Sequence, residues 1–217
     1  MLFNRITMSV NKMEEEQIFI DNNGLEIEGL LTKAAQDSGV VICHPHSLMG
    51  GSMHNNVVEA IKDAFAAEKY STLRFNFRGV GRSTGMYNEG KGEQEDIIAV
   101  CKHLRNMGIM KLFFAGYSFG SWVGSQVIQK DDNPFTGSIF VSPPINYFDF
   151  DFTKLSNKIN AIICGSHDQF CDLDTLQKQA KKLNANLNII ADADHFYLDR
   201  ERELIKIIKM NIFGNKK

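Results

Sequence analysis

The chain has 217 residues, of which 43% are hydrophobic and 23% are charged, and its formal net charge is −2 at pH 7. This length and composition suit one globular domain with a full hydrophobic core. Acidic and basic residues are interspersed and no apolar run is long enough to span a bilayer, so neither nucleic acid nor a membrane is an expected partner.

The N-terminal segment lacks the apolar core of a secretory leader, and three consecutive glutamates follow at 14–16. We therefore expect a flexible tail over residues 1–16, a single domain over residues 17–217 and a cytoplasmic location. None of the cysteines forms a Cys-x-x-Cys pair, so neither a disulfide framework nor a zinc site is expected. The cysteines are Cys43, Cys101, Cys164 and Cys171.

After the tail, strand and helix patterns alternate, which predicts an α/β fold with a mostly parallel sheet and helices on both faces. The helix expected at 52–69, for example, has Val57, Ile61, Ala64 and Phe65 on one face. Strands are expected at 17–20, 26–31, 40–43, 73–77, 111–115, 138–141, 161–164 and 187–190. Helices are expected at 52–69, 93–107, 118–130, 172–183 and 199–212.

The most informative motif is the pentapeptide Gly-Tyr-Ser-Phe-Gly at 116–120. It fits Gly-x-Ser-x-Gly, a sharp turn between a strand and a helix that exposes a serine hydroxyl. The apolar run at 111–115 is typical of a buried strand, and residues 121–130 have the apolar face of a helix. Ser118 is therefore the expected nucleophile, although serine is also a favoured residue for capping a helix.

Two further loops follow predicted strands and carry the partners that a serine nucleophile needs. Asp168 lies in the loop after the strand at 161–164, and His195 lies in the loop after the strand at 187–190. The carboxyl ends of parallel strands share one edge of a sheet, so we expect these side chains to meet Ser118 there. His195 would accept the serine proton, and Asp168 would orient the imidazole.

Four other carboxylates lie near these positions in the sequence. Asp172 and Asp174 are expected to cap or begin the helix that follows. Asp192 and Asp194 are so close to His195 in sequence that the far ring nitrogen is awkward for them to reach. Asp168, in the loop after the strand at 161–164, is therefore the predicted partner of His195.

The negative charge that develops on a substrate oxygen needs preorganised donors, and two backbone N–H groups are candidates. One belongs to Phe119, at the start of a helix whose dipole favours negative charge. The other belongs to His46, in the loop at 44–51 that follows the strand at 40–43. The neighbouring Pro45 has no N–H to offer.

Three other patterns resemble parts of binding sites. The histidines at 44, 46 and 54 have no acidic or cysteine ligand beside them, so a metal site is not expected. Residues 85–91 follow most of a P-loop pattern, but Gly92 replaces the serine or threonine that would bind magnesium. Arg78 and Arg82 either hold their glycine-rich loop in place or contact an acidic substrate.

Two longer segments complete the pattern. Residues 44–51 read His-Pro-His-Ser-Leu-Met-Gly-Gly, and residues 74–85 read Arg-Phe-Asn-Phe-Arg-Gly-Val-Gly-Arg-Ser-Thr-Gly. Together with the serine turn and the Ala-Asp-His-Phe segment at 193–196, they resemble small, lidless α/β-hydrolases, in the branch similar to dienelactone hydrolases and peptidases. Ser47 stands where that group usually has a second proline. The resemblance covers residues 17–213.

This resemblance implies an α/β-hydrolase fold with a minimal lid or none. It also implies serine hydrolase chemistry through an acyl-enzyme, without a metal or an organic cofactor. We expect the substrate to be a small-molecule carboxylic ester or a related acyl compound. A serine peptidase or amidase of the same fold is one alternative, and a non-catalytic binding protein on this fold is the other.

The chain between the strands at 138–141 and 161–164 leaves little room for a lid. Its aromatic segment at 147–152 either packs against the domain or forms an exposed patch, used in a homodimer or as a small substrate flap. Apolar side chains from the loops are expected to line a pocket for the acyl group. They are Met49, Met53, Phe119, Tyr147, Phe170 and Phe196.

Overall fold

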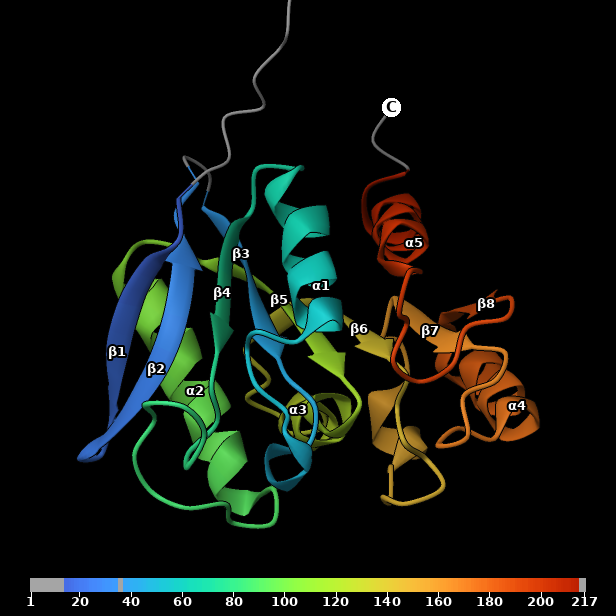
Figure 1. The fold of residues 1–217 in the computed structure, drawn as a ribbon, viewed down its shortest axis with the longest axis horizontal. Coiled ribbons are helices and arrows are strands. Elements are labelled where there is room, and N and C mark those ends of the chain that lie inside the picture. Colours follow the sequence, from blue (N-terminus) through green and yellow to red (C-terminus); the bar gives the residue numbers. More distant parts are fainter. Residues whose placement is uncertain (1–13, 35–36, 215–217) are drawn as a thin grey trace, which may run out of the picture.

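The computed structural model describes residues 14–34 and 37–214, in which eight strands form one sheet (Figure 1). The strands lie in the order β1-β2-β4-β3-β5-β6-β7-β8. β2 is antiparallel to both β1 and β4, and the other neighbouring pairs are parallel. The strands are β1 (Glu16–Asn22), β2 (Leu25–Thr32), β3 (Ser38–Cys43), β4 (Ser71–Phe75), β5 (Lys111–Tyr117), β6 (Phe135–Val141), β7 (Ala161–Gly165) and β8 (Asn186–Ile190).

Helices cover both faces of this sheet. α1 and α5 pack on one face, and α2, α3 and α4 pack on the other (Figure 1). The predicted mostly parallel sheet with helices on both faces is therefore confirmed. The helices are α1 (Asn56–Ala66), α2 (Lys91–Asn106), α3 (Phe119–Ile128), α4 (Leu173–Leu183) and α5 (Glu201–Phe213), with short 3-10 helices η1 (Ser47–Met49) and η2 (Phe152–Leu155).

The central strand β3 illustrates how the sequence specifies this layering. Val40, Val41, Ile42 and Cys43 are all fully buried, because helices cover both faces of the sheet. The four apolar residues predicted to lie on one face of α1 are also fully buried, and they pack in the same core as alternate residues of β3. The continuous apolar run of β3 and the apolar face of α1 therefore pack against each other in one core.

Most element boundaries differ from the sequence prediction by a few residues, and for two of them the structure shows the cause. α1 begins at Asn56, because the side chain of Asn55 accepts the N–H of Val57 at 2.9 Å and caps the helix there. β4 ends two residues before the predicted boundary, because the N–H of Phe77 donates to the ring of His44 at 3.0 Å instead of joining a strand ladder. Hydrogen bonds to side chains therefore determine where α1 begins and where β4 ends.

The predicted tail at residues 1–16 falls mostly outside the described residues, which begin at residue 14. Within the described part, Glu15 forms an ion pair of 2.6 Å with the buried Arg74, and Glu16 begins β1. β1 therefore begins one residue before the predicted strand. Across the described ranges, no helix combines the length and apolar character that a membrane span requires.

The place of β3 in the sheet determines where a site can form. From β3 the chain continues to β4 on one side, and it reaches β5 on the other side later in the sequence. The loops after β3 and β5 therefore leave the sheet in opposite directions, and a crevice opens between them at the carboxyl edge. The loops after β7 and β8 reach the same edge (Figure 1).

Candidate active site

The serine turn joins β5 directly to α3 and holds Ser118 in an uncommon backbone conformation, with φ 52° and ψ −123°. Two glycines make this possible. A Cβ on Gly116 would lie 2.6 Å from the Cα of Ser121, and a Cβ on Gly120 would lie 2.6 Å from the carbonyl oxygen of Cys43. Because Gly120 has no side chain, the start of α3 can pack closely against the end of β3, which brings the two loops of the crevice together.

Ser118, His195 and Asp168 form one chain of hydrogen bonds. The Oγ of Ser118 lies 2.9 Å from Nε2 of His195, and Nδ1 of that ring lies 2.9 and 3.0 Å from the two oxygens of Asp168. The three residues are only 8%, 6% and 5% exposed, respectively. Because a carboxylate accepts at Nδ1, Nε2 is free to accept the serine proton, which is the arrangement of a catalytic triad.

Several contacts hold Asp168 in its charged form. Burial raises the pKa of this carboxyl, but the hydrogen bond and charge of His195, with further hydrogen bonds from Ser142 and the N–H of Phe170, outweigh it. The pKa of Asp168 is therefore lower than usual. The N–H of Phe170 donates at 2.9 Å, and the thiol of Cys164 points to the other oxygen at 3.7 Å.

The loop that carries His195 is fixed from two sides. The hydroxyl of Tyr117 donates to the carbonyl of His195 at 2.8 Å, which ties the loop to the end of β5. Asp194 accepts the N–H groups of Phe196 and Tyr197 at 2.9 and 3.2 Å, so it shapes the turn and does not reach the ring. Among the described residues, Asp168 is the carboxylate that contacts the imidazole.

The other alternative carboxylates also have structural positions. Asp172 caps α4 by accepting the N–H of Thr175 at 2.6 Å, and Asp174 lies in the first turn of that helix. This agrees with the expectation that they cap or begin a helix. Arg78 forms a buried ion pair of 2.8 Å with Asp96. The backbone N–H of Arg82 donates to Glu28 at 2.8 Å, and its guanidinium donates to Gln17 at 3.3 Å. Both arginines thus hold their loop.

The loop after β3 presents the second half of the predicted oxyanion hole. The carbonyl of His46 accepts the N–H groups of Met49 and Gly51, each at 3.0 Å, which folds the loop back on itself. The N–H groups of His46 and Phe119 have no hydrogen-bond partner within the described part of the chain. Both are therefore available to a ligand at the crevice.

His44 supports this loop from beneath. Its Nε2 accepts the N–H of Phe77 at 3.0 Å, so its Nδ1–H donates to the carbonyl of Pro45 at 2.6 Å. Burial lowers the pKa of His44 to about 4, so the ring is neutral at pH 7. It is a structural side chain, and the described histidines at 44, 46 and 54 do not form a metal cluster.

Comparison with known proteins identifies the family. Residues 35–164 match the sequence profile of the family described as serine aminopeptidase, S33. The chain belongs to this family of α/β-hydrolases. It is 31% identical over 208 residues to an uncharacterized protein of Rickettsia prowazekii, a match that spans 88% of this chain and 86% of the relative.

Solved structures agree with this assignment. An α/β serine hydrolase homologue from Coxiella burnetii is 29% identical, with a TM-score of 0.84 over 92% of this chain and 98% of that one. A serine hydrolase without a lid from Xanthomonas campestris is 26% identical, with a TM-score of 0.81 over 92% and 94%. The chain is thus a small, lidless α/β serine hydrolase.

In this hydrolase, Ser118 lines a cavity of 510 Å³ with mostly apolar walls. The connection from β6 to β7, which the structure describes in full, holds only the short η2 and forms no lid domain. Several residues of the mouth are strongly exposed, with Met49 at 78%, Tyr147 at 66% and Phe196 at 51%. The lining residues include Pro45, His46, Met49, Phe119, Tyr147, Phe148, Phe170 and Phe196.

Met53 differs from the expectation that it lines this cavity. It is 1% exposed and lies in the core, away from the lining. Its N–H donates to the side chain of Asn76 at 2.8 Å, and its carbonyl accepts from Arg74 at 2.8 Å. These two bonds from the β4 region fix the backbone so that the side chain points inward.

The aromatic segment at 147–152 packs mostly against the domain. The ring of Phe148 lies 4.6 Å from that of Trp122 and 5.7 Å from that of Phe119, measured between centroids. The indole N–H of Trp122 donates to the carbonyl of Asp149 at 3.0 Å, which anchors the segment on α3. Phe148 and Tyr147 also line the cavity, and the exposed ring of Tyr147 contacts Phe170 at its mouth.

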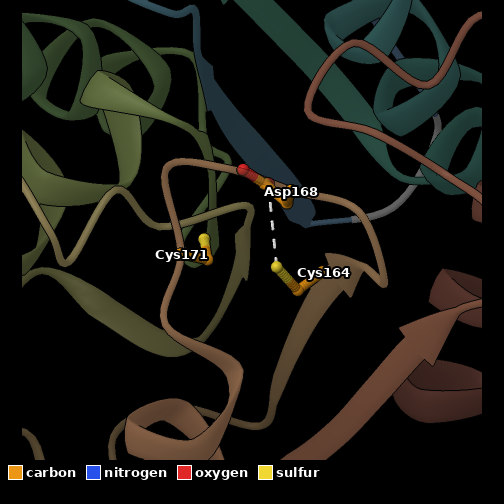
Figure 2. Close-up of side chains that lie close together, drawn as sticks. All are labelled: Cys164, Asp168 and Cys171. Atoms are coloured by element: carbon orange, nitrogen blue, oxygen red, sulfur yellow. Dashed lines mark hydrogen bonds between the residues drawn. The ribbon is translucent and has the colours of Figure 1, made fainter.

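In the part of the chain that the structure describes, one group of side chains that could hold a metal ion includes the triad carboxylate and two thiols beside it. Cys164, Asp168 and Cys171 are buried, and their ligand atoms all lie within 4.8 Å of one another (Figure 2). Sequence reasoning did not find this group, because a spacing of seven residues between the cysteines matches no metal-binding motif. The tight loop between β7 and α4 creates it.

Proposed function

We propose that this serine hydrolase cleaves carboxylic esters of small, apolar or aromatic molecules through an acyl-enzyme. The observation that carries this proposal is the hydrogen-bonded chain from Asp168 through His195 to Ser118, which ends in an apolar cavity beside two free N–H groups. A buried nucleophile, base and orienting acid next to preorganised donors are the parts that acyl transfer requires.

In the first half-reaction, the Oγ of Ser118 attacks the ester carbonyl carbon while its proton passes to Nε2 of His195. The charged carboxylate of Asp168 stabilises the imidazolium that forms. The oxyanion lies between the N–H groups of Phe119 and His46. Collapse of the tetrahedral intermediate breaks the bond to the alcohol, and His195 gives the leaving oxygen its proton.

In the second half-reaction, a water molecule attacks the acyl-enzyme. Its proton passes to Nε2 of His195, and the hydroxide oxygen bonds to the acyl carbon. The intermediate then releases the carboxylic acid as His195 returns a proton to the Oγ of Ser118. The enzyme is regenerated, and one water has been consumed for each ester bond that is cleaved.

The cavity supports small substrates with apolar groups. Its volume of 510 Å³ lies within the range of about 300–1,000 Å³ that is common for small-molecule sites. Three aromatic rings of the cavity wall lie around the imidazole, with centroid distances of 4.4 Å for Phe170, 5.4 Å for Tyr117 and 5.7 Å for Phe196. Because His195 must protonate the leaving group, that group would lie against these rings, and an aromatic alcohol suits them.

Aminopeptidase activity is the second candidate, because the family description names it. Recognition of a free peptide N-terminus requires a group that binds an ammonium ion, normally a carboxylate. None of the described residues that line the cavity is acidic. This composition favours a neutral ester over an aminoacyl peptide.

The experiment that tests the proposal compares substrates on the purified protein. Aryl esters of acetate, butyrate, octanoate and palmitate are assayed beside an aminoacyl anilide with a free amino group. We expect the highest kcat/KM for the short and medium esters, and little turnover of the anilide. A maximum at palmitate would contradict the predicted size limit, and a preference for the anilide would favour the peptidase.

The nucleophile is tested separately with a fluorophosphonate probe, which labels activated serines. We expect labelling of the wild-type protein and its loss in Ser118→Ala. The matched control is Ser156→Ala, which removes an exposed hydroxyl far along the chain and should leave labelling unchanged. An unlabelled wild-type protein would point to a non-catalytic role for the fold.

A further inference from the structure

The cluster behind the triad contains two thiols and the triad carboxylate (Figure 2). Cys164 lies in β7 and is fully buried, whereas Cys171 lies in the loop before α4 and is 6% exposed. Sγ of Cys164 is 3.7 Å from Oδ2 of Asp168. The thiol of Cys171 also reaches the carbonyl oxygen of Pro143, at 2.8 Å.

These distances suit a cation with tetrahedral coordination. With bonds of about 2.3 Å from Zn²⁺ to sulfur and about 2.0 Å to oxygen, tetrahedral ligands lie roughly 3.5–3.8 Å apart. The 3.7 Å between Cys164 and Asp168 is already in that range, and the remaining ligand atoms lie within 4.8 Å. Small side-chain rotations would therefore complete the site, and the carbonyl of Pro143 is near enough to offer a fourth oxygen.

We propose that Cys164, Asp168 and Cys171 form a binding site for a thiophilic divalent cation such as Zn²⁺, and that its occupation reversibly inhibits the hydrolase. Binding forms two metal–thiolate bonds and one metal–carboxylate bond. Two S–H bonds break, and both protons pass to solvent. Because two protons leave as one dication enters, the net charge of this buried site stays the same, and the metal–ligand bonds offset the cost of desolvating the cation.

Inhibition follows from the oxygen that the cation would take. Oδ2 of Asp168 is one of the two oxygens that receive the Nδ1–H of His195, at 2.9 Å. Coordination draws the charge of this carboxylate towards the cation, so it stabilises the imidazolium less in the transition state. None of the three ligands lines the substrate cavity, so substrate binding should change little. This inhibitory part rests on the proposed hydrolase function.

The first experiment detects the site without measuring activity. The full-length protein, kept reduced with a phosphine, is titrated with Cd²⁺, whose bonds to thiolate give a charge-transfer band in the ultraviolet. We expect one Cd²⁺ per chain in the wild type and loss of the band in Cys171→Ser. Cys101→Ser is the matched control, because Cys101 is equally buried but lies in α2, outside the cluster.

Two results would contradict the proposed metal site. One is the absence of a Cd²⁺–thiolate band in the wild-type protein, which needs no variant to interpret. The other is an equally strong band in Cys171→Ser, which would assign the metal to other ligands. If Cys171→Ser does not fold, as judged by circular dichroism, Cys164→Ala takes its place in the comparison.

The second experiment measures ester hydrolysis with and without Zn²⁺ in each variant. In the wild type and Cys101→Ser, we expect kcat to fall by about tenfold or more, because the coordinated carboxylate stabilises the imidazolium less in the transition state. KM should be nearly unchanged, and activity should recover on adding a chelator. In Cys171→Ser, the ratio of the two rates should stay near one. Equal inhibition of Cys171→Ser would show that Zn²⁺ acts elsewhere, for instance on His195. Absence of turnover in metal-free protein would contradict the proposed function and leave the Cd²⁺ result standing.

Discussion

One oxygen of Asp168 contacts both the catalytic imidazole and a thiol. Its Oδ2 lies 2.9 Å from Nδ1 of His195 and 3.7 Å from Sγ of Cys164. Its position just past β7 brings it to the histidine, whereas Asp194, only one residue from His195, points into its own turn. At the scale of single residues, function therefore depends on where a strand ends more than on distance along the sequence.

Asp168→Asn tests the role of this carboxylate. The amide keeps the shape of the side chain but can offer an N–H to Nδ1, which leaves the imidazole proton on Nε2, where it blocks proton transfer from Ser118. We expect kcat for an aryl ester to fall by about 10³–10⁴, the size seen when a triad acid becomes an amide. The melting temperature should change little by comparison, and both quantities are measured on the same preparation.

The control for this prediction is Asp172→Asn, a change of the same atoms four positions further on. Asp172 caps α4, and asparagine caps helices about as well as aspartate, so both kcat and stability should remain near the wild-type values. Equal losses of kcat in the two variants would show that the carboxylate of Asp168 has no specific part in catalysis.

At the scale of elements, the contact between α3 and the end of β3 assembles the site. The two predicted oxyanion donors lie on different elements, His46 in the loop after β3 and Phe119 at the start of α3. Gly120 lets these elements touch, because a Cβ there would lie 2.6 Å from the carbonyl oxygen of Cys43 and 2.7 Å from that of His44. The distance between the donors therefore depends on a residue that does not line the cavity.

Gly120→Ala should separate the two donors. Both obstructing atoms belong to the backbone, so α3 must shift, and we expect a loss of about 1–3 kcal/mol in the free energy of unfolding. Displacing one oxyanion donor should also lower kcat by roughly tenfold to several hundredfold. Denaturant unfolding and aryl ester kinetics measure the two effects.

Gly108→Ala is the comparison for Gly120→Ala. Gly108 has φ +87° but no heavy atom within 4 Å of the added Cβ, so alanine brings backbone strain of about 1 kcal/mol and no clash. Its kcat should match the wild type. If Gly120→Ala also retained full kcat, the contact between α3 and β3 would not control the oxyanion hole.

The same elements show how far the sequence could predict the molecule. Ser118, Asp168 and His195 could be proposed together because each follows a strand, and parallel strands end at one edge. The start of α1 could not be predicted, because it depends on which side chain caps the helix. Met53 was beyond reach for a similar reason, since its inward direction is set by Asn76 and Arg74, more than twenty residues away.

The thiol cluster shows a further limit at this scale. Cys164 could be predicted as a buried residue of a strand, but the convergence of Cys171 depends on how the loop from β7 to α4 folds. No periodicity or motif encodes that fold. Contacts that arise inside an irregular loop have no local signature in the sequence, even where the flanking strand and helix are clear.

At the scale of the whole molecule, His44 links two parts of the sheet. It follows β3, and its ring accepts the N–H of Phe77 beyond the end of β4. The ring must be neutral to accept this bond, and burial lowers its pKa from 6.5 to about 4. Folding and protonation of His44 therefore oppose each other, so the stability of the whole fold depends on pH.

The sign and window follow from the two pKa values. Between pH 6.5 and about 4 the unfolded chain binds a proton at His44 that the folded chain does not, so stability rises with pH in this window. The contribution is fully present above pH 6.5 and is lost as the pH falls towards 4. With about 1.4 kcal/mol for each pKa unit, the loss from pH 7.5 to pH 5 is on the order of 2 kcal/mol.

Urea unfolding at pH 7.5 and pH 5 measures this loss, and His44→Gln isolates it. Glutamine can still donate and accept hydrogen bonds but does not titrate, so the variant should lose about 2 kcal/mol less than the wild type between the two pH values, even if it is less stable at both. His54→Gln, which replaces an exposed histidine, should keep the wild-type dependence. An identical pH dependence in His44→Gln and the wild type would mean that His44 is not the group whose protonation destabilises the fold, and the acid sensitivity would then have to arise from other groups.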